Sequence, residues 1–207
     1  MPGLERLPEA GDEGGGRAPA RAALTFDDGP DPDATPAVLD ELERLGLTAT
    51  FFLVGEQLQR HWSIARETRA RGHRLALHGH SHPEHHLLPP PAARDEVARG
   101  IGAFEAAVGE RPSLFRPPYG RFSEHSYEAC RTLGLTPVYW SAWGMDWEEI
   151  EGGRIADLAA RDLEPGMVIL LHDSARYATR RSAAPTVEAL PEIARRAAAS
   201  GVALGPI

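Results

Sequence analysis

Two adjacent carboxylates, Asp27 and Asp28, follow directly on an apolar run in the segment LTFDDGP. The run at residues 22–26 is short and ends at a Gly-Pro turn, which is typical of a buried strand. In parallel α/β folds the carboxyl ends of the strands face the ligand crevice. A buried unpaired carboxylate is costly, so two acids there indicate a metal, a cation or a proton-transfer task. The alternative is that one aspartate caps the turn and the other is solvated.

A histidine-rich segment follows the third strand-like run. His78 and His82, in the sequence HGHSH, could reach one ion if the segment turns helically. A catalytic divalent metal also needs a third protein ligand, and either Asp27 or Asp28 could supply it. The alternative is a polar loop without a metal. The other histidines of the segment are expected to point away from the ion or into solvent: His80, His85 and His86.

Further polar residues follow the later strand-like runs. His172 ends the run LLHD and is expected to donate a proton, since histidine titrates near neutrality. A satisfied core histidine and an additional metal ligand are the alternatives. Asp146 is expected to accept a ring N–H from His172, because the two strands are consecutive. Arg116 is expected to hold one of the first two acids ionised, with a surface salt bridge as the alternative. Tyr119 could present its backbone N–H to an oxyanion.

Three tryptophans, Trp140, Trp143 and Trp147, lie within eight residues. Aromatic side chains beside a cleft stack on sugar rings or wall an apolar pocket, whereas in a core they only pack. Trp143 and Trp147 follow the strand, which favours the cleft for these two.

Strand-like and helix-like patterns alternate along the chain, which predicts parallel βαβ units in an α/β barrel or a doubly wound sheet. No linker divides residues 22–207, so one domain is expected. Residues 1–21 are rich in glycine and acidic residues at their centre and are expected to form a disordered arm. The predicted helices span 35–45, 56–70, 91–108, 123–133, 155–163 and 186–200. The predicted strands span 22–26, 48–54, 74–77, 113–116, 136–141, 167–171 and 201–204.

The composition narrows the partners and the location. A formal charge of −8 over 207 residues argues against nucleic acid and anionic membranes. A single cysteine excludes an internal disulfide. No apolar run approaches the roughly 18 residues of a membrane-spanning helix. Because the first 21 residues contain no apolar signal-peptide core, a cytoplasmic location is expected, or the cell envelope if the chain is trimmed. A monomer is assumed.

The motifs TFDDGP, HGHSHP, RPPYG, DW and LLHD, in this order, resemble the five motifs of the polysaccharide deacetylases. These are the NodB-homology proteins of carbohydrate esterase family 4. The resemblance covers residues 22–204 and implies a distorted (β/α)7 barrel. It implies removal of N-acetyl groups from chitin, chitooligosaccharides or peptidoglycan sugars, or of O-acetyl groups from xylan. A glycan containing N-acetylglucosamine is the expected substrate, and one divalent metal, zinc or alternatively cobalt, is the expected cofactor.

The resemblance also implies a role for each matching position. Asp27 would be the general base, oriented by Arg116, and His172 the general acid, tuned by Asp146. Only the resemblance assigns Asp28, rather than its neighbour, to the metal. Three residues would bind the metal: Asp28, His78 and His82. Three others would shape the substrate site: Tyr119 through its backbone N–H at the oxyanion, and Trp147 and Leu170 as walls of the acetyl methyl pocket.

Two positions depart from the family pattern. Gly79 replaces a serine or threonine that usually hydrogen-bonds within the histidine loop. Trp143 replaces an aspartate before the Asp-Trp pair, and this indole is expected to alter the substrate groove. Two other functions are carried as alternatives, and Trp143 favours the first of them. One is a deformylase or amidase acting on a small or lipid-linked substrate, and the other is a barrel that binds carbohydrate without turnover.

Overall fold

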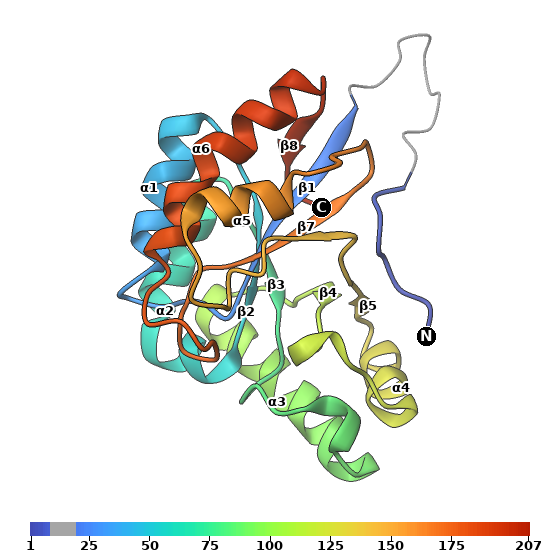
Figure 1. Ribbon diagram of the computed structural model, residues 1–207. Helices are drawn as coiled ribbons and strands as arrows, with labels where there is room; N and C mark the ends of the chain where they lie inside the picture. The colour runs from blue at the N-terminus through green and yellow to red at the C-terminus, as the bar shows by residue number, and fades with distance from the viewer. Residues whose placement is uncertain (9–19) are drawn as a thin grey trace, which may run out of the picture.

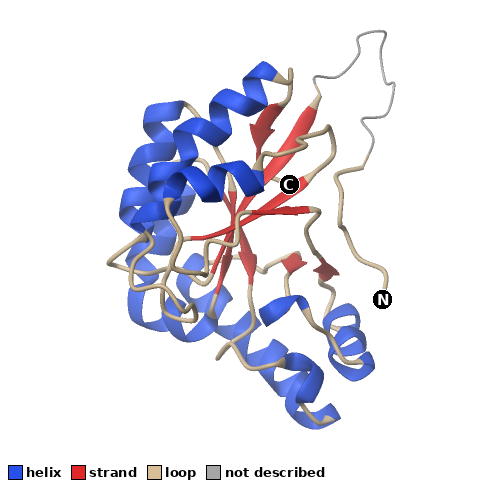
Figure 2. Cartoon of the chain, in the orientation of Figure 1, coloured by secondary structure: helices blue, strands red, loops and turns tan. Residues whose placement is uncertain are grey.

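A computed structural model describes residues 1–8 and 20–207 of the chain. Its helices lie around the outer side of a curled sheet (Figures 1 and 2). The strands are β1 (Arg21–Asp27), β2 (Thr50–Leu53), β3 (Arg74–Leu77), β4 (Leu114–Phe115), β5 (Thr136–Pro137), β6 (Ala142–Trp143), β7 (Val168–His172) and β8 (Ala203–Gly205). The α-helices are α1 (Thr35–Leu45), α2 (Gly55–Ala70), α3 (Pro90–Val108), α4 (Glu124–Thr132), α5 (Gly152–Ala159) and α6 (Ala184–Ala199). Two 3-10 turns complete the elements: η1 (His85–Leu87) and η2 (Pro118–Gly120).

The sheet order is β5-β4-β3-β2-β1-β7-β6, with β8 paired to the start of β1, and the paired strands are parallel. The predicted fold class, a distorted α/β barrel in a single domain, is confirmed. The predicted strand at 136–141 is instead the two-residue β5, and a separate strand, β6, follows it. Val138 donates its N–H to the backbone oxygen of Phe115 in β4, whereas Ser141 donates its N–H to the backbone oxygen of Val168 in β7. The chain therefore crosses between the two edges of the sheet here, and one continuous strand cannot pair with both.

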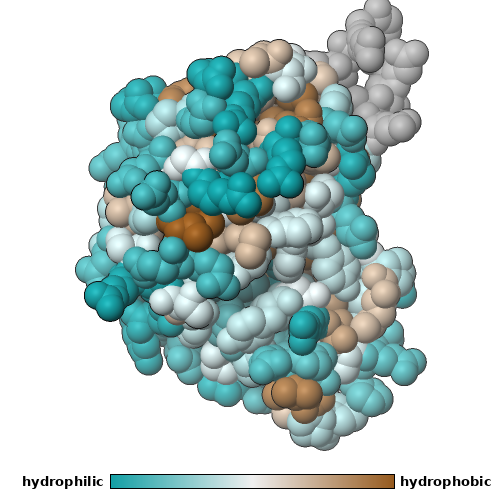
Figure 3. All heavy atoms as spheres, in the orientation of Figure 1, coloured by the Kyte–Doolittle hydropathy of each residue, from teal (hydrophilic) through white to brown (hydrophobic). Residues whose placement is uncertain are grey.

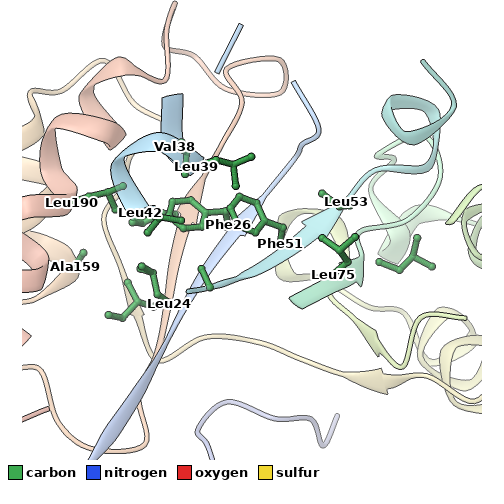
Figure 4. Packing of buried hydrophobic residues seen from close by; sticks show 14 of the residues in the cluster. Leu24, Phe26, Val38, Leu39, Leu42, Phe51, Leu53, Leu75, Ala159 and Leu190 are labelled. Carbon is green, nitrogen blue, oxygen red and sulfur yellow. The ribbon is translucent and has the colours of Figure 1, made fainter. Parts of the chain in front are cut away.

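The two faces of the sheet bury different side chains, because successive residues of a strand point to opposite sides. Phe26 and Phe51 stack with ring centroids 5.0 Å apart and pack against α1 residues such as Leu39 and Leu42 (Figure 4). The neighbouring residue Phe52 belongs to a smaller cluster that contains no helical residue. That cluster fills the inner side of the curled sheet beneath the strand ends.

The first residues of the chain pack against the barrel. Leu4 pairs with Val138 and contacts the inner cluster together with Ile207. Arg6 pairs with Met167. Residues 1–8 therefore differ from the predicted disordered arm, because Leu4 packs against the inner cluster and the backbone at Leu4 and Arg6 pairs with the barrel. Residues 9–19 of that arm lie outside the described residues, and the domain boundary at residue 22 stays a prediction.

Local sequence signals set the helix ends. Gly46 ends α1 with φ 65°, a left-handed conformation that glycine adopts without a steric penalty. Ser123 and Ser126 form a reciprocal capping box at the start of α4. The face in Figure 3 is largely hydrophilic, with small separate hydrophobic patches. Within the described residues, we find no helix with the length and apolar character needed to cross a bilayer.

Candidate active site

The carboxyl ends of the strands surround a cavity of about 520 Å³. The carboxyl ends of parallel strands lie at the same end of the barrel, so segments far apart in sequence meet there. Eight of the predicted site residues line the cavity: Asp27, Asp28, His78, His82, Tyr119, Trp147, Leu170 and His172. Two more, Arg116 and Asp146, are buried behind it and reach it through Asp27 and His172.

Asp28, His78 and His82 form a candidate metal site. Asp28 Oδ1 lies 3.5 Å from His78 Nε2 and 3.1 Å from His82 Nε2, and one ligand atom from each residue lies within 4.8 Å of the others. Within the described residues, this Asp28 oxygen is buried without a hydrogen bond of good geometry. Burial alone would raise the pKa of Asp28. The two facing imidazoles more than offset burial, and the pKa of this carboxyl lies well below its usual range. An anionic oxygen and two imidazole nitrogens converging in a buried site fit a divalent cation.

The two imidazoles are oriented in different ways. His78 Nδ1 lies 2.8 Å from the backbone oxygen of Arg116, so it donates there and leaves the lone pair of Nε2 facing Asp28. His82 stacks on Tyr177 with centroids 4.0 Å apart and an interplanar angle of 7°. The ring of Tyr119 meets the same imidazole edge-on at 4.8 Å. One ligand is therefore held by a hydrogen bond and the other by aromatic packing.

Backbone strain is concentrated at this site. Of four non-glycine residues with positive φ in the described chain, three line the cavity: Asp28 at 84°, His82 at 61° and Tyr119 at 58°. L-residues adopt this conformation at an energetic cost, and it persists where the surroundings enforce it, often at functional sites.

Arg116, buried behind the cavity, holds Asp27 in one orientation. Its Nη1 donates to Asp27 Oδ1 at 2.6 Å and to Thr25 Oγ1 at 2.9 Å, and its Nη2 donates to the backbone oxygen of Tyr139. The guanidinium lies over the ring of Phe52 at 4.0 Å and is fully buried, so the alternative of a surface salt bridge is wrong. Burial lowers the pKa of Arg116, and the adjacent Asp27 opposes that shift.

His172 lies opposite Asp27 in the register of β1 and β7. Its Nδ1 lies 2.8 Å from Asp146 Oδ1, and its backbone N–H donates to Asp146 Oδ2 at 2.8 Å. Burial lowers the pKa of His172, but the charge and hydrogen bond of Asp146, together with the charges of Asp28 and Asp27, outweigh burial and raise it to about 9. The imidazole therefore carries a proton at neutral pH, and among the described residues it lies outside the group that could hold a metal.

Two sequence expectations differ from the structure. Trp143 lies on β6, is 45% exposed and lines a separate hollow of about 310 Å³ beside α5, so it does not border the active-site cavity. β6 is a two-residue strand at the edge of the sheet, and there the indole lies beside Leu158 and Ala159 at the end of α5. His85 was expected in solvent but is fully buried, packed 5.5 Å from the ring of Phe115.

Sequence reasoning missed several residues that complete the site. Thr186 donates its hydroxyl to Asp146 Oδ2 at 2.7 Å, and Arg180 Nη1 lies 3.5 Å from the same oxygen. Neither residue carries a spacing signal, because each is more than 30 residues from Asp146. Tyr177 could have been found, since it is an aromatic residue in the loop that follows the strand end at His172.

The fold and the site together define a class: curled parallel α/β barrels with a candidate metal centre flanked by Asp-Arg and His-Asp pairs. Residues 15–138 match the family model described as polysaccharide deacetylase. The chain belongs to this family, and the resemblance seen in its motifs is confirmed.

Two relatives and a solved structure agree with this assignment. A chitooligosaccharide deacetylase of Bradyrhizobium sp. (strain ANU 289) is 35% identical over 72% of this chain and 69% of the relative. A peptidoglycan-N-acetylglucosamine deacetylase of Bacillus cereus is 32% identical over 75% of this chain. That match spans 56% of the Bacillus protein, little more than half its length. A family 4 carbohydrate esterase from Streptomyces lividans, solved in complex with acetate, has a TM-score of 0.81 and 33% identity over 90% of this chain and 92% of the other.

Proposed function

We propose that this protein is a metal-dependent hydrolase that removes N-acetyl groups from a glycan containing N-acetylglucosamine, such as peptidoglycan or a chitooligosaccharide. The observation that carries the proposal is the convergence of Asp28, His78 and His82 in one cavity between Asp27 and His172. The activities named for the Bradyrhizobium and Bacillus relatives support the substrate class.

One carboxylate and two imidazoles would hold a single divalent cation, and this donor set suits zinc, with cobalt as an alternative. When bound, such a cation polarises a carbonyl and lowers the pKa of a water molecule. The proton transfers and the binding of the acetyl group use side chains and backbone groups of the protein itself.

Asp27 acts as the general base. Its Oδ1 is occupied by Arg116 at 2.6 Å, whereas its Oδ2 faces the ligand site, 3.7 Å from His78 Nε2. Because Arg116 is buried and hydrogen-bonded on several sides, it keeps the carboxylate in one orientation. Asp27 takes a proton from the water that attacks the acetyl carbon.

His172 acts as the general acid on the leaving group. With a pKa of about 9 it is protonated at neutral pH, and Asp146 engages its Nδ1–H, leaving Nε2–H to donate. As the carbon–nitrogen bond breaks, this proton passes to the amine nitrogen. The products are acetate and a free amino sugar, so the proton taken by Asp27 and the proton given by His172 balance the hydrolysis.

The remaining predicted residues would bind the acetyl group. The backbone N–H of Tyr119 would donate to the oxyanion. Trp147, whose ring meets the imidazole of His172 edge-on at 5.7 Å, and the buried Leu170 would enclose the methyl group. The carbohydrate-binding alternative is not favoured, because a barrel without turnover has no need to keep both proton-transfer pairs.

Measured release of acetate tests the proposal. The protein is stripped of metal, reloaded with Zn²⁺, and incubated with chitooligosaccharides, peptidoglycan and acetylated xylan. Formylated amines are the comparison substrate. We expect acetate from the N-acetylated glycans, lost on chelation and restored by Zn²⁺. Release of formate alone would support the amidase alternative, and glycan binding without any release would support the binding protein.

A further inference from the structure

The loop that joins His78 to His82 has little side-chain support of its own. It begins with Gly79, whose φ of 80° is left-handed, and a Cβ there would lie 3.4 Å from Glu96 Oε1. His78 and His82 can address one ion only if this connection holds a single conformation. The support must therefore come from outside the loop.

Glu96 of α3 supplies that support. Its Oε1 accepts the backbone N–H of His80 at 2.7 Å and of Ser81 at 2.6 Å. Its Oε2 accepts the hydroxyl of Ser81 at 3.0 Å. The side chain thus binds the middle of the loop, between the two histidines that face Asp28.

The opposite side of the loop is held by the start of α2. The N–H of Gly55 donates to the Gly79 oxygen at 3.0 Å, and the N–H of Glu56 donates to the His80 oxygen at 2.8 Å. One turn after Glu96, Gly100 brings the backbone of α3 so close that a Cβ there would lie 3.1 Å from the Gly79 oxygen. The loop is therefore clamped between two helices.

A carboxylate is an unusual choice for this position. Glu96 is 5% exposed, and its neighbours on the buried face of α3, Val97 and Ile101, are apolar. Burying a carboxylate is costly unless hydrogen bonds compensate it. Here all three bonds go to the loop, and none of them stabilises the helix that carries the residue.

We propose that Glu96 is a positioning residue for the metal centre: it fixes the loop so that the imidazoles of His78 and His82 stay directed at one point beside Asp28. This inference rests on the metal site of the proposed function. Residues that orient metal ligands typically contribute about 10–100-fold to metal affinity.

Zinc affinity, measured by competition with a chromophoric chelator at 20 °C, tests the role without relying on activity. Glu96→Ala is expected to weaken Zn²⁺ binding by about 10–100-fold. Glu96→Gln keeps the length and an oxygen that can accept both amides, so its affinity is expected within about threefold of the wild-type value. Asp95→Ala removes an exposed carboxylate from the adjacent position and is the matched control.

The unfolding midpoint of each metal-free variant shows that it is folded at the assay temperature. If Glu96→Ala does not fold, Glu96→Asp replaces it, because its carboxylate is one methylene too short to reach the loop, and the same loss is expected. Wild-type Zn²⁺ affinity in Glu96→Ala, or in Glu96→Asp where that variant replaces it, overturns the inference. A loss of affinity in Glu96→Gln as large as that in the shortened variant also overturns it. A wild-type protein that does not bind Zn²⁺ refutes the proposed function itself, so the two failures are distinguishable.

Discussion

Replacing Asp146 with asparagine removes the charge that controls His172. Asp146 Oδ2 accepts the backbone N–H of His172 and the hydroxyl of Thr186. The oxygen of an asparagine is expected to keep these two bonds, which turns its NH₂ group towards His172 Nδ1. The imidazole must then accept at Nδ1, so the neutral form with the proton on Nε2 is favoured. A neutral imidazole is a far weaker acid than the imidazolium.

The size of the effect follows from the pKa of His172. In the folded protein this pKa is about 9, against an ordinary value of 6.5, and Asp146 is the main cause of the rise. Without that charge the pKa falls to 6.5 or towards it. At pH 7.5 the protonated fraction then drops from about 97% to about 10%. This change alone costs about tenfold in rate, and complete loss of a general acid costs about 10²–10⁴-fold.

Two measurements check the prediction. NMR titration of the metal-free protein is expected to give a His172 pKa near 9 in the wild type and at least about 2 units lower in Asp146→Asn. The rate of acetate release by the variant is expected to fall at a lower pH than that of the wild type. Asp157→Asn, an exposed substitution on α5, is the control. Equal pKa values in the variant and the wild type would refute the assignment of Asp146.

The same pair contributes to stability with a definite sign. Because the folded pKa of His172 lies above its unfolded value, the contribution is fully present below about pH 6.5 and is lost as the pH rises through about 9. A shift of this size corresponds to about 3 kcal/mol. Urea unfolding is expected to show the largest difference between wild type and Asp146→Asn below pH 6.5.

Three further substitutions separate base, metal ligand and structural acid. Asp27→Asn is expected to lower acetate release by about 10²–10⁴-fold with Zn²⁺ still bound; normal turnover would contradict the base assignment. Asp28→Ala removes the carboxylate ligand, and chelator competition should show a larger loss of Zn²⁺ affinity than the about 10–100-fold typical of a supporting residue; unchanged affinity would exclude it as a ligand. Asp173 accepts the Gly29 N–H at 3.1 Å, and burial raises its pKa to about 7. Its folded pKa lies above 3.8, so ionisation costs stability as the pH rises through about 7. Asp173→Asn is therefore expected to be more stable than the wild type in urea at pH 8, and this difference in stability is expected to become small near pH 4. No difference at pH 8 would refute the pKa shift.

Local patterns predicted most of the fold. The buried run before Asp27 has the continuous apolar character of a parallel strand between two neighbours, and it forms β1. Glycine at position 46 and serine at position 123 end and start helices where expected. These features depend on residues within one turn of each other, so their physical cause can be read along the chain.

The division into β5 and β6 could not be predicted in this way. Residues 136–143 form one largely apolar stretch, and the break arises because its two ends pair with strands on opposite edges of the sheet. The position of Trp143 at the sheet edge, away from the active-site cavity, follows from the same break. Pairing partners that are distant in sequence leave no periodic signal in the segment itself.

The candidate site shows the same boundary. Residue types, order and spacing were enough to nominate the two histidines, the pair of aspartates and the acid, because each lies at or just after a strand end and parallel strands bring their ends together. Only the resemblance to the family distinguished the base, Asp27, from the ligand, Asp28. Folding added the groups that orient them: Glu96 on the histidine loop, Tyr177 on His82, and Thr186 and Arg180 on Asp146. Each acts through a direct contact between segments far apart in the chain, and only three-dimensional packing specifies such contacts.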